Sequence, residues 1–146
     1  MLVATLAWPQ NHTNMIELQS LIPNIMVRDV NATMDYYTKR LGFSAVDTNP
    51  AEGKLEWGYV KRGEVGLMFQ EVSSIKNEYP SLSALSVGGA LTLYIRIQDI
   101  QAFYESLEGK VKIIKTLNTT FYGAKEFALE DINGFILTFS EIKDSK

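Results

Sequence analysis

Two stretches of the sequence decide its fold: LEWGYVKRGEVGLMFQE at residues 55–71 and KEFALEDINGFILTFSE at residues 125–141. They align without a gap at an offset of 70 residues, so that Glu56 stands over Glu126. In each stretch, apolar and polar residues alternate on either side of a short segment that contains glycine. This pattern is typical of two half-buried strands joined by a tight turn. Each stretch therefore predicts a β-hairpin.

A second pair of stretches follows the same offset. IPNIMVRDV at residues 22–30 aligns with TLYIRIQDI at residues 92–100, and Asp29 then matches Asp99. Short windows match easily by chance, whereas one offset that serves two separate blocks does not. The sequence therefore predicts an internal duplication, in which two similar halves share one fold.

Each half is predicted to contain a strand, a helix and three further strands. Apolar residues at helical spacing precede Gly42 in the first half and Gly109 in the second, and glycine is typical of a helix end. The expected elements of the first half are strands near 21–28, 43–48, 54–61 and 65–71, with a helix near 31–41. Those of the second half are strands near 90–97, 110–116, 124–130 and 135–141, with a helix near 99–108.

The 146 residues suit one domain, which buries about two-thirds of the surface of its unfolded chain. The segment between the halves is rich in Ser and Gly, and we expect it to be a mobile flap or an irregular crossover. Within this one domain we expect an N-terminal arm at 1–19, a first module at 20–72, a connector at 73–89 and a second module at 90–146.

The composition excludes several classes of function. The chain contains no cysteine, which excludes disulfides, thiolate metal sites and cysteine nucleophiles. Its net charge is −3 and no cluster of Lys and Arg stands out, so nucleic acid is not an expected partner. No apolar run reaches the roughly 20 residues that span a bilayer, and the first residues lack the basic region of a secretory signal. We therefore expect a cytoplasmic protein that has no membrane partner.

Strand alternation predicts that each sheet has one face covered by helices and one open face. In the strand near 90–97, leucines and isoleucines form one side, and Thr92, Tyr94 and Arg96 form the other. A mixed polar and aromatic face suits a ligand surface. It also suits a packed barrel interior that contains a few satisfied hydroxyl groups, and the residues alone leave both interpretations open.

IPNIMVRDVNATMDYYTKRLGF (22–43) and YGAKEFALEDINGFILTF (122–139) resemble the vicinal oxygen chelate superfamily, which includes glyoxalases, bleomycin-resistance proteins and dioxygenases. The resemblance covers roughly residues 20–141. It implies an α+β fold of two tandem β-α-β-β-β modules that form a half-open barrel and pair in a homodimer. The superfamily contains many activities, so the resemblance indicates the fold more strongly than the function.

In metal-dependent members of this superfamily, His or Glu ligands stand on the first and last strands of each module. The matching positions here are Ile22, Met68, Thr92 and Thr138. None offers the imidazole or carboxylate that a catalytic divalent ion prefers. The single histidine, His12, lies in the N-terminal arm. We therefore expect no metal and no cofactor.

The resemblance to metal-free bleomycin-resistance proteins implies a homodimer that binds a small organic ligand, aromatic or cationic, without chemistry. Gly58 and Ala128, matched by the offset, are expected to leave space for it. The same offset aligns Trp57 with Phe127. A position of Trp57 against the helices is therefore an open alternative. The candidate ligand-binding residues are Asn24, Met26, Trp57, Met68, Thr92, Tyr94, Phe121, Tyr122, Glu126, Ala128 and Thr138.

The expected function is metal-independent sequestration of a small molecule, such as an antibiotic or a toxic metabolite. One alternative is an enzyme of the same fold, of the lyase, isomerase or dioxygenase type, that uses a non-standard site. In that case a buried Glu56 or Glu126 would be the general base. Another alternative is a structural or regulatory dimer whose cavity is filled.

Overall fold

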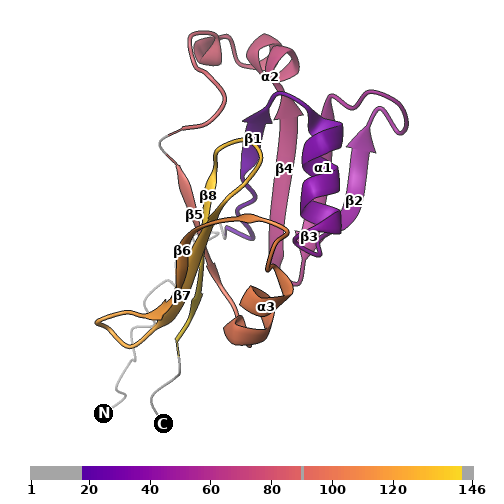
Figure 1. Ribbon diagram of the computed structural model, residues 1–146. Coiled ribbons are helices and arrows are strands. Elements are labelled where there is room, and N and C mark those ends of the chain that lie inside the picture. Colours follow the sequence, from indigo (N-terminus) through magenta and orange to yellow (C-terminus); the bar gives the residue numbers. More distant parts are fainter. Residues whose placement is uncertain (1–17, 90, 143–146) are drawn as a thin grey trace, which may run out of the picture.

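The computed structural model describes residues 18–89 and 91–142 and contains two four-stranded sheets (Figure 1). The first sheet has the strand order β1-β4-β3-β2, and the second has the order β5-β8-β7-β6. In each sheet the first strand pairs in parallel with the last, and the remaining pairs are antiparallel. The predicted α+β fold and the duplicated topology are therefore confirmed, with open sheets and no closed barrel.

The first module begins at Asn24 and closely follows the predicted order. Asp29 caps its helix, because the Asp29 carboxylate accepts a hydrogen bond from the backbone N–H of Ala32 at 2.9 Å. Gly42 follows the helix with a φ of +71°, a conformation that favours glycine. The elements are β1 (Asn24–Val27), α1 (Val30–Lys39), β2 (Ser44–Asn49), β3 (Trp57–Arg62) and β4 (Val65–Glu71).

The connector is more regular than expected. It contains the helix α2 (Val72–Glu78) and the short 3-10 helix η1 (Pro80–Leu82). The Glu71 carboxylate stabilises the start of α2, since it accepts hydrogen bonds from the N–H groups of Ser73 and Ser74. The expectation of an irregular crossover is therefore wrong for this part of the connector, whereas a mobile flap stays a prediction.

The second module repeats the order of the first. Its elements are β5 (Thr92–Arg96), α3 (Ile100–Ser106), β6 (Lys112–Thr119), β7 (Lys125–Glu130) and β8 (Ile136–Glu141). None of the helices within the described residues is long and apolar enough to cross a membrane.

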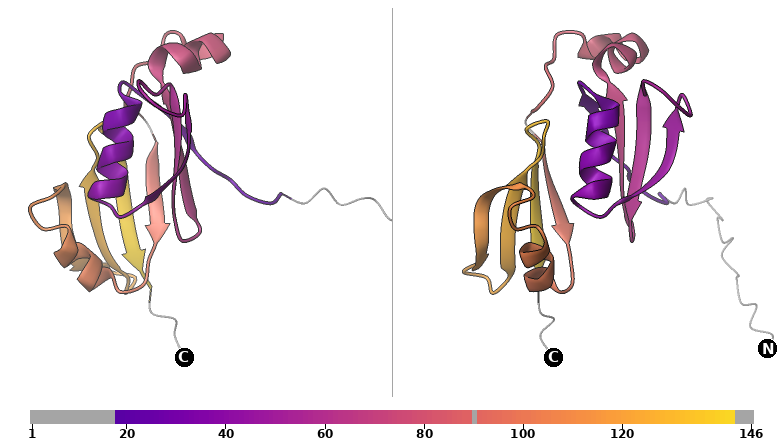
Figure 2. Two further views of the ribbon diagram at one scale, coloured as in Figure 1. Left: turned by 90° about the vertical axis from the view of Figure 1, so that its right-hand side faces the viewer. Right: turned by 45° about the vertical axis from the view of Figure 1, so that its right-hand side comes forward.

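One hydrophobic core joins the two modules. In the right-hand view of Figure 2, α1 lies between the two sheets. The core combines residues of the first module, such as Tyr37 and Phe69, with residues of the second, such as Phe127 and Phe139. These side chains are at most 3% exposed, so their burial stabilises both modules together.

Polar contacts also cross the boundary between the modules. The Tyr37 hydroxyl on α1 donates to the Asp131 carboxylate at 2.7 Å, and the Asn133 amide donates to the Thr33 hydroxyl at 3.0 Å. All four residues are buried. Buried hydrogen bonds of this kind fix one arrangement of the modules, because breaking them would leave polar atoms without partners.

The sheet register corrects the gapless alignment of the two halves. Thr138 on β8 pairs with Ala128 on β7, whereas Met68 on β4 pairs with Tyr59 on β3. The offset is therefore 70 residues for β4 and β8 but 69 residues for β3 and β7. A shift by one residue moves every side chain of a strand to the other face of the sheet.

The two hairpin turns explain this shift. Two residues, Gly63 and Glu64, link β3 and β4. After β7, the Asp131 N–H donates to the Phe135 carbonyl at 2.9 Å, so three residues (132–134) make the corresponding turn. The second hairpin is thus one residue longer than the first, which accounts for the difference in offset.

Two expectations that relied on the gapless alignment are therefore wrong. Gly58 faces α1, and a Cβ atom there would lie 2.6 Å from the Met34 sulfur. Gly58 gives room to a core side chain and leaves no space for a ligand. Trp57 and Tyr59 lie on the opposite side, so they do not occupy the helix-facing positions that parity with Phe127 suggested.

Candidate functional site

The side of the second sheet that faces away from α3 is named here the second open face. Tyr94 pairs with Thr138 and Thr138 with Ala128, so these three residues lie side by side across β5, β8 and β7. Their neighbours in the strands point to the core instead. The second open face comprises Thr92, Tyr94, Arg96, Lys115, Glu126, Ala128, Glu130, Ile136, Thr138 and Ser140.

A carboxylate at the edge of this face holds three neighbouring side chains. One oxygen of Glu126, Oε1, accepts hydrogen bonds from the hydroxyls of Tyr122 at 2.7 Å and Tyr94 at 2.8 Å. The other oxygen, Oε2, lies 3.7 Å from the Lys115 ammonium. Glu126 is only 3% exposed, whereas the rings of Tyr94 and Tyr122 are about half exposed. The cluster therefore presents two aromatic rings to solvent above a buried negative charge.

The same contacts set the protonation of the cluster. Burial by itself would raise the pKa of Glu126, but hydrogen bonds from Tyr122 and Tyr94 and the charge of Lys115 outweigh it and lower that pKa. The hydrogen bond to Glu126 raises the pKa of Tyr122. At neutral pH the cluster therefore contains the Glu126 carboxylate and the protonated Tyr122 phenol. A carboxyl group with a lowered pKa is a weak general base, so this arrangement suits binding better than proton transfer.

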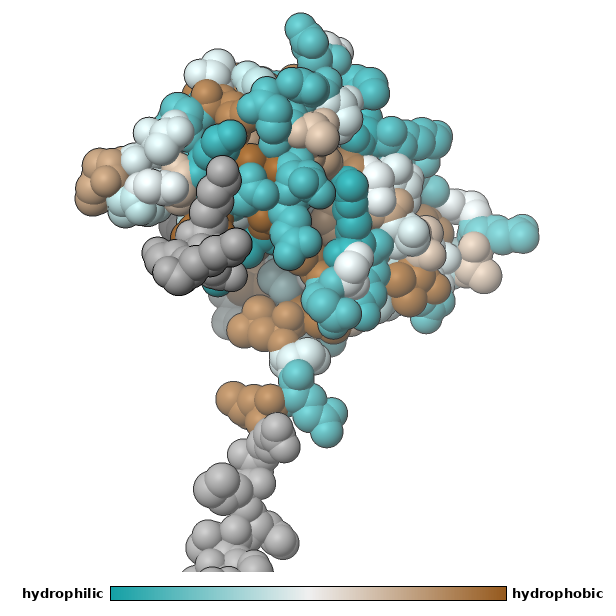
Figure 3. All heavy atoms as spheres, turned by 90° about the horizontal axis from the view of Figure 1, so that it is seen from below, coloured by the Kyte–Doolittle hydropathy of each residue, from teal (hydrophilic) through white to brown (hydrophobic). Residues whose placement is uncertain are grey.

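A hairpin next to the cluster carries further aromatic surface. Thr120 and Gly123 close the β6–β7 turn through backbone hydrogen bonds, and Gly123 has a φ of +84°. Phe121, at the tip of the turn, is fully exposed and packs edge-on against Tyr122 with ring centroids 4.9 Å apart. Seen from below, most of the molecular surface is polar and apolar side chains appear in separate patches (Figure 3).

The corresponding side of the first sheet, the first open face, has different chemistry. The Asn24 amide donates to the Gln70 side chain at 2.7 Å, and Gln70 donates in turn to Ser74 and Glu78 of α2. The helix α2 therefore holds one end of this face through Gln70. The first open face comprises Asn24, Met26, Trp57, Tyr59, Gly66, Met68 and Gln70.

The predicted ligand-binding residues thus divide between two surfaces of the chain. Asn24, Met26, Trp57 and Met68 lie on the first open face. Thr92, Tyr94, Glu126, Ala128 and Thr138 lie on the second, and Phe121 and Tyr122 stand in the turn beside it. The structure brings together Tyr94, Tyr122 and Glu126, but it does not bring the two groups of residues together within one chain.

Sequence reasoning missed two residues of these faces that contact other candidates. Lys115 approaches Glu126 from β6, whose pairing with β7 shifts register on both sides of Lys115. Simple alternation fails in such an irregular strand, so no signal in the sequence identified it. Gln70 was detectable, because it follows Met68 by two residues on the same strand and therefore shares its face.

The residues at the family's metal positions do not fit a catalytic ion. Ile22 lies just before β1, and Met68, Thr92 and Thr138 stand on the open faces. Their aliphatic, thioether and hydroxyl groups are poor ligands for a divalent catalytic metal. Within residues 18–89 and 91–142, no group of three or more His, Cys, Asp or Glu residues is close enough to hold a metal ion. His12 lies outside the described residues.

Comparisons with solved structures agree with the topology. A protein of unknown function from Agrobacterium tumefaciens str. C58 is 20% identical, with a TM-score of 0.72 over 88% of this chain and 97% of that chain. TioX from Micromonospora sp. ML1 is 14% identical, with a TM-score of 0.69 over 84% and 98%. The bleomycin-binding protein of Streptomyces verticillus, solved in complex with copper(II)-bleomycin, is 20% identical, with a TM-score of 0.62 over 88% and 100%. At these identities the likeness shows a shared fold.

A comparison of the sequence with models of protein families identifies a family. The family model of the Glyoxalase/Bleomycin resistance protein/Dioxygenase superfamily matches residues 10–139. A search among curated proteins finds no match. The family match covers most of the chain and agrees with the duplicated β-α-β-β-β topology. The chain therefore belongs to the Glyoxalase/Bleomycin resistance protein/Dioxygenase superfamily.

Proposed function

We propose that this protein binds a small organic molecule on its second open face without a metal ion and without chemical conversion. The observation that carries this proposal is the Glu126 carboxylate, which is held by Tyr94 and Tyr122 under two half-exposed aromatic rings. A fixed charge beside aromatic surface is typical of a ligand site. The lowered pKa of Glu126 argues against a role as general base and so favours binding over the enzymatic alternative.

The cluster favours a ligand that carries a cationic or amine group next to a flat ring. Lys115 lies 3.7 Å from Glu126 and is half exposed, so it can turn into solvent and leave the carboxylate to a ligand cation. The rings of Tyr94 and Tyr122 can stack on the ligand ring or lie against its cation. The small side chain of Ala128, next to Thr138, leaves space for a ligand at the centre of the face. A toxic metabolite or an antibiotic of this chemistry would be sequestered.

The shared fold with a bleomycin-binding protein supports a binding role in general terms. Both proteins have the architecture of the superfamily, whose members differ widely in activity. We therefore take from this likeness only the binding of a small molecule, and not the place where it binds or the identity of the ligand.

We further propose that two copies of the chain close the open faces against each other. Tyr94 of the second open face is about half exposed, and Met26, Trp57 and Met68 of the first are partly exposed. A second copy would cover them and would turn each exposed face into a cleft. Light scattering should then report about twice the chain mass of 16.4 kDa, and a monomer at all concentrations would contradict the closed cleft.

Thermal denaturation with a panel of compounds tests the proposed site. The panel contains bleomycin, cationic aromatic amines, neutral aromatic compounds, small oxo-acids and divalent metals. A ligand at 100 times its Kd should stabilise the fold by about 2.7 kcal/mol, which raises the Tm by several degrees. We expect this response from a cationic aromatic compound in the absence of metal. A response only to a metal, alone or with an oxo-acid, would contradict the proposal.

Two variants and one control test whether the ligand binds on the second open face. Glu126→Gln removes the charge but keeps the shape, and it should weaken a cationic ligand about tenfold. Ala128→Trp should block the face in a protein that still folds. Glu56→Gln makes the same charge change at an exposed position and should leave the affinity unchanged. Equal affinities in all three variants would remove Glu126 and Ala128 from the site.

A further inference from the structure

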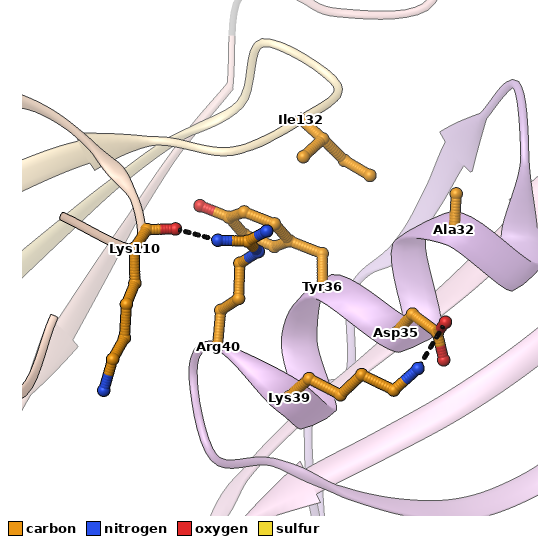
Figure 4. A pocket seen from close by; sticks show the side chains of 7 residues that line it. All are labelled: Ala32, Asp35, Tyr36, Lys39, Arg40, Lys110 and Ile132. Atoms are coloured by element: carbon orange, nitrogen blue, oxygen red, sulfur yellow. Dashed lines mark hydrogen bonds and ion pairs between the residues drawn. The ribbon is translucent and has the colours of Figure 1, made fainter.

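A hollow separates α1 from the second module on the helix side of the molecule (Figure 4). It has a volume of about 550 Å³ and adjoins a second hollow of about 440 Å³. Tyr36, Arg40, Lys110 and Ile132 line both, so they stand at the junction. We call these two spaces together the seam hollow. The larger one is lined by Ala32, Asp35, Tyr36, Lys39, Arg40, Lys110 and Ile132, none of which lies on either open face.

The carboxylates around the seam hollow already have partners. Asp35 pairs with Lys39 at 2.7 Å. Glu130 pairs with Lys112 at 2.9 Å. Asp131 accepts hydrogen bonds from the Tyr37 hydroxyl and from the N–H groups of Asn133 and Phe135. Asp35 and Glu130 are therefore neutralised by their own lysines, whereas Asp131, held only by neutral donors, keeps its negative charge beside the hollow.

Two cations at the junction form no ion pair. The Arg40 guanidinium donates to the backbone carbonyl of Lys110 at 2.7 Å, and no carboxylate of the described residues pairs with it. Within residues 18–89 and 91–142, the Lys110 ammonium likewise forms no ion pair. Both side chains are exposed. With the Asp131 carboxylate counted against them, the junction has an excess of one positive charge.

The Tyr36 hydroxyl adds a hydrogen-bond donor to this spot. Its side chain is only 6% exposed, and within the described residues the hydroxyl has no hydrogen-bond partner. Figure 4 shows the ring extending from α1 toward Lys110, with the Arg40 side chain beside it. Burial, with a smaller effect of the nearby Asp131 carboxylate, raises the pKa of Tyr36 to about 12, so the hydroxyl stays protonated. A buried hydroxyl without a partner destabilises the fold, and a bound acceptor would remove that penalty.

We propose that the seam hollow binds the phosphate or carboxylate group of a small molecule, through Arg40, Lys110 and the Tyr36 hydroxyl. Arg40 exchanges the Lys110 carbonyl for the oxyanion, to which its planar guanidinium donates two parallel hydrogen bonds. This movement opens the Tyr36 hydroxyl, which becomes the third donor. The rest of the ligand lies against Ile132 and Ala32 in the remaining space. This site is independent of the open faces.

Titration calorimetry with inorganic phosphate, and separately with acetate, tests the seam hollow in the full chain. The first probe represents phosphorylated ligands and the second represents carboxylates, so the tighter of the two identifies the class. Arg40→Gln and Lys110→Gln should each weaken the tighter probe about tenfold. Lys61→Gln makes the same charge change on β3, away from the hollow, and should change the affinity less than about twofold because distant surface charges are screened.

Tyr36→Phe separates a binding role from a structural one. The variant should be at least as stable as the wild type, because it removes a buried hydroxyl that has no partner. It should nevertheless bind the tighter probe more weakly. A loss of stability with unchanged affinity would overturn the assignment of Tyr36. Equal weakening by Lys61→Gln and Arg40→Gln, or no binding of either probe at millimolar concentration, would overturn the site.

Discussion

The two open faces occupy equivalent places in the duplicated halves but carry different chemistry. The first has a network of neutral amides at one end, where Gln70 links Asn24 to α2. The second has a carboxylate, Glu126, between two tyrosine hydroxyls. The helix-facing sides are much more alike, since Phe69 and Phe139 both lie in the core. Packing restricts the residues on the covered side, whereas the open side is free to change for binding.

The largest expected effect tests the register that separates these faces. Phe127 is fully buried and stacks on Phe139 with ring centroids 5.1 Å apart, so Phe127→Ala should lower the free energy of unfolding by about 3–5 kcal/mol. Trp57, its counterpart in the gapless alignment, is only partly buried on the first open face. Trp57→Ala should therefore lower that energy by only about 1–2 kcal/mol. Denaturant unfolding measures both, and equal losses would contradict the one-residue shift.

A smaller effect sharpens the comparison between the two helices. Tyr37 on α1 donates a buried hydrogen bond to Asp131 of the other module, and Tyr37→Phe should lower the free energy of unfolding by about 1.5–3 kcal/mol. Tyr104 on α3 packs edge-on against Phe127 of its own module. Tyr104→Phe serves as the matched control and should change stability by less than about 0.5 kcal/mol. If the two variants lose equal stability, the contact between Tyr37 and Asp131 is not specific.

The smallest expected effect concerns the charge on the second open face. Hydrogen bonds hold the pKa of Glu126 in the folded protein below its ordinary value of 4.5. Its ionised form therefore stabilises the fold at pH values above 4.5, and this contribution disappears as the pH falls through the lower, folded pKa. Glu126→Gln should be less stable than the wild type at neutral pH by less than about 1 kcal/mol, since the tyrosines that hold Glu126 are half exposed.

Unfolding measured from pH 7 to pH 3 checks this contribution. The difference in stability between wild type and Glu126→Gln should close as the solution becomes more acidic. A gap that widens toward low pH would reverse the sign of the pKa shift and with it the account of the tyrosine hydrogen bonds.

The sequence was sufficient for the fold because several local signals agreed. Strand alternation, the helical spacing of apolar residues and the glycine after each helix all predicted the same two β-α-β-β-β units. The internal offset placed β4 over β8 correctly. Agreement between independent signals of this kind is typical of a sequence that specifies one structure.

The errors came from positions where one signal acted alone. The match of Glu56 with Glu126 favoured a gapless alignment through a turn, although turns are where lengths differ between related segments. The helix α2 has seven residues, which is too short for a clear helical period, and its start depends on the Glu71 side chain. Lys115 lies in a strand with irregular pairing, so alternation could not assign its face.

The candidate site was predicted in its members but not in its arrangement. Alternation identified Tyr94 and Thr138 on one face, and the structure places them side by side. Tyr122 and Tyr94 donate to the same oxygen of Glu126. This shared contact depends on the path of the β6–β7 turn. Such contacts between loop and strand follow from tertiary structure and have no period in the sequence.

The additional residue in the second hairpin has a consequence for how such proteins diversify. A turn of three residues in place of two absorbs the extra residue, so the residues of β7 keep the faces that their counterparts in β3 have 69 positions earlier. Turns at the surface tolerate such changes of length. A duplicated protein can thus gain or lose one codon in a turn while the inner and outer residues of both strands keep their places.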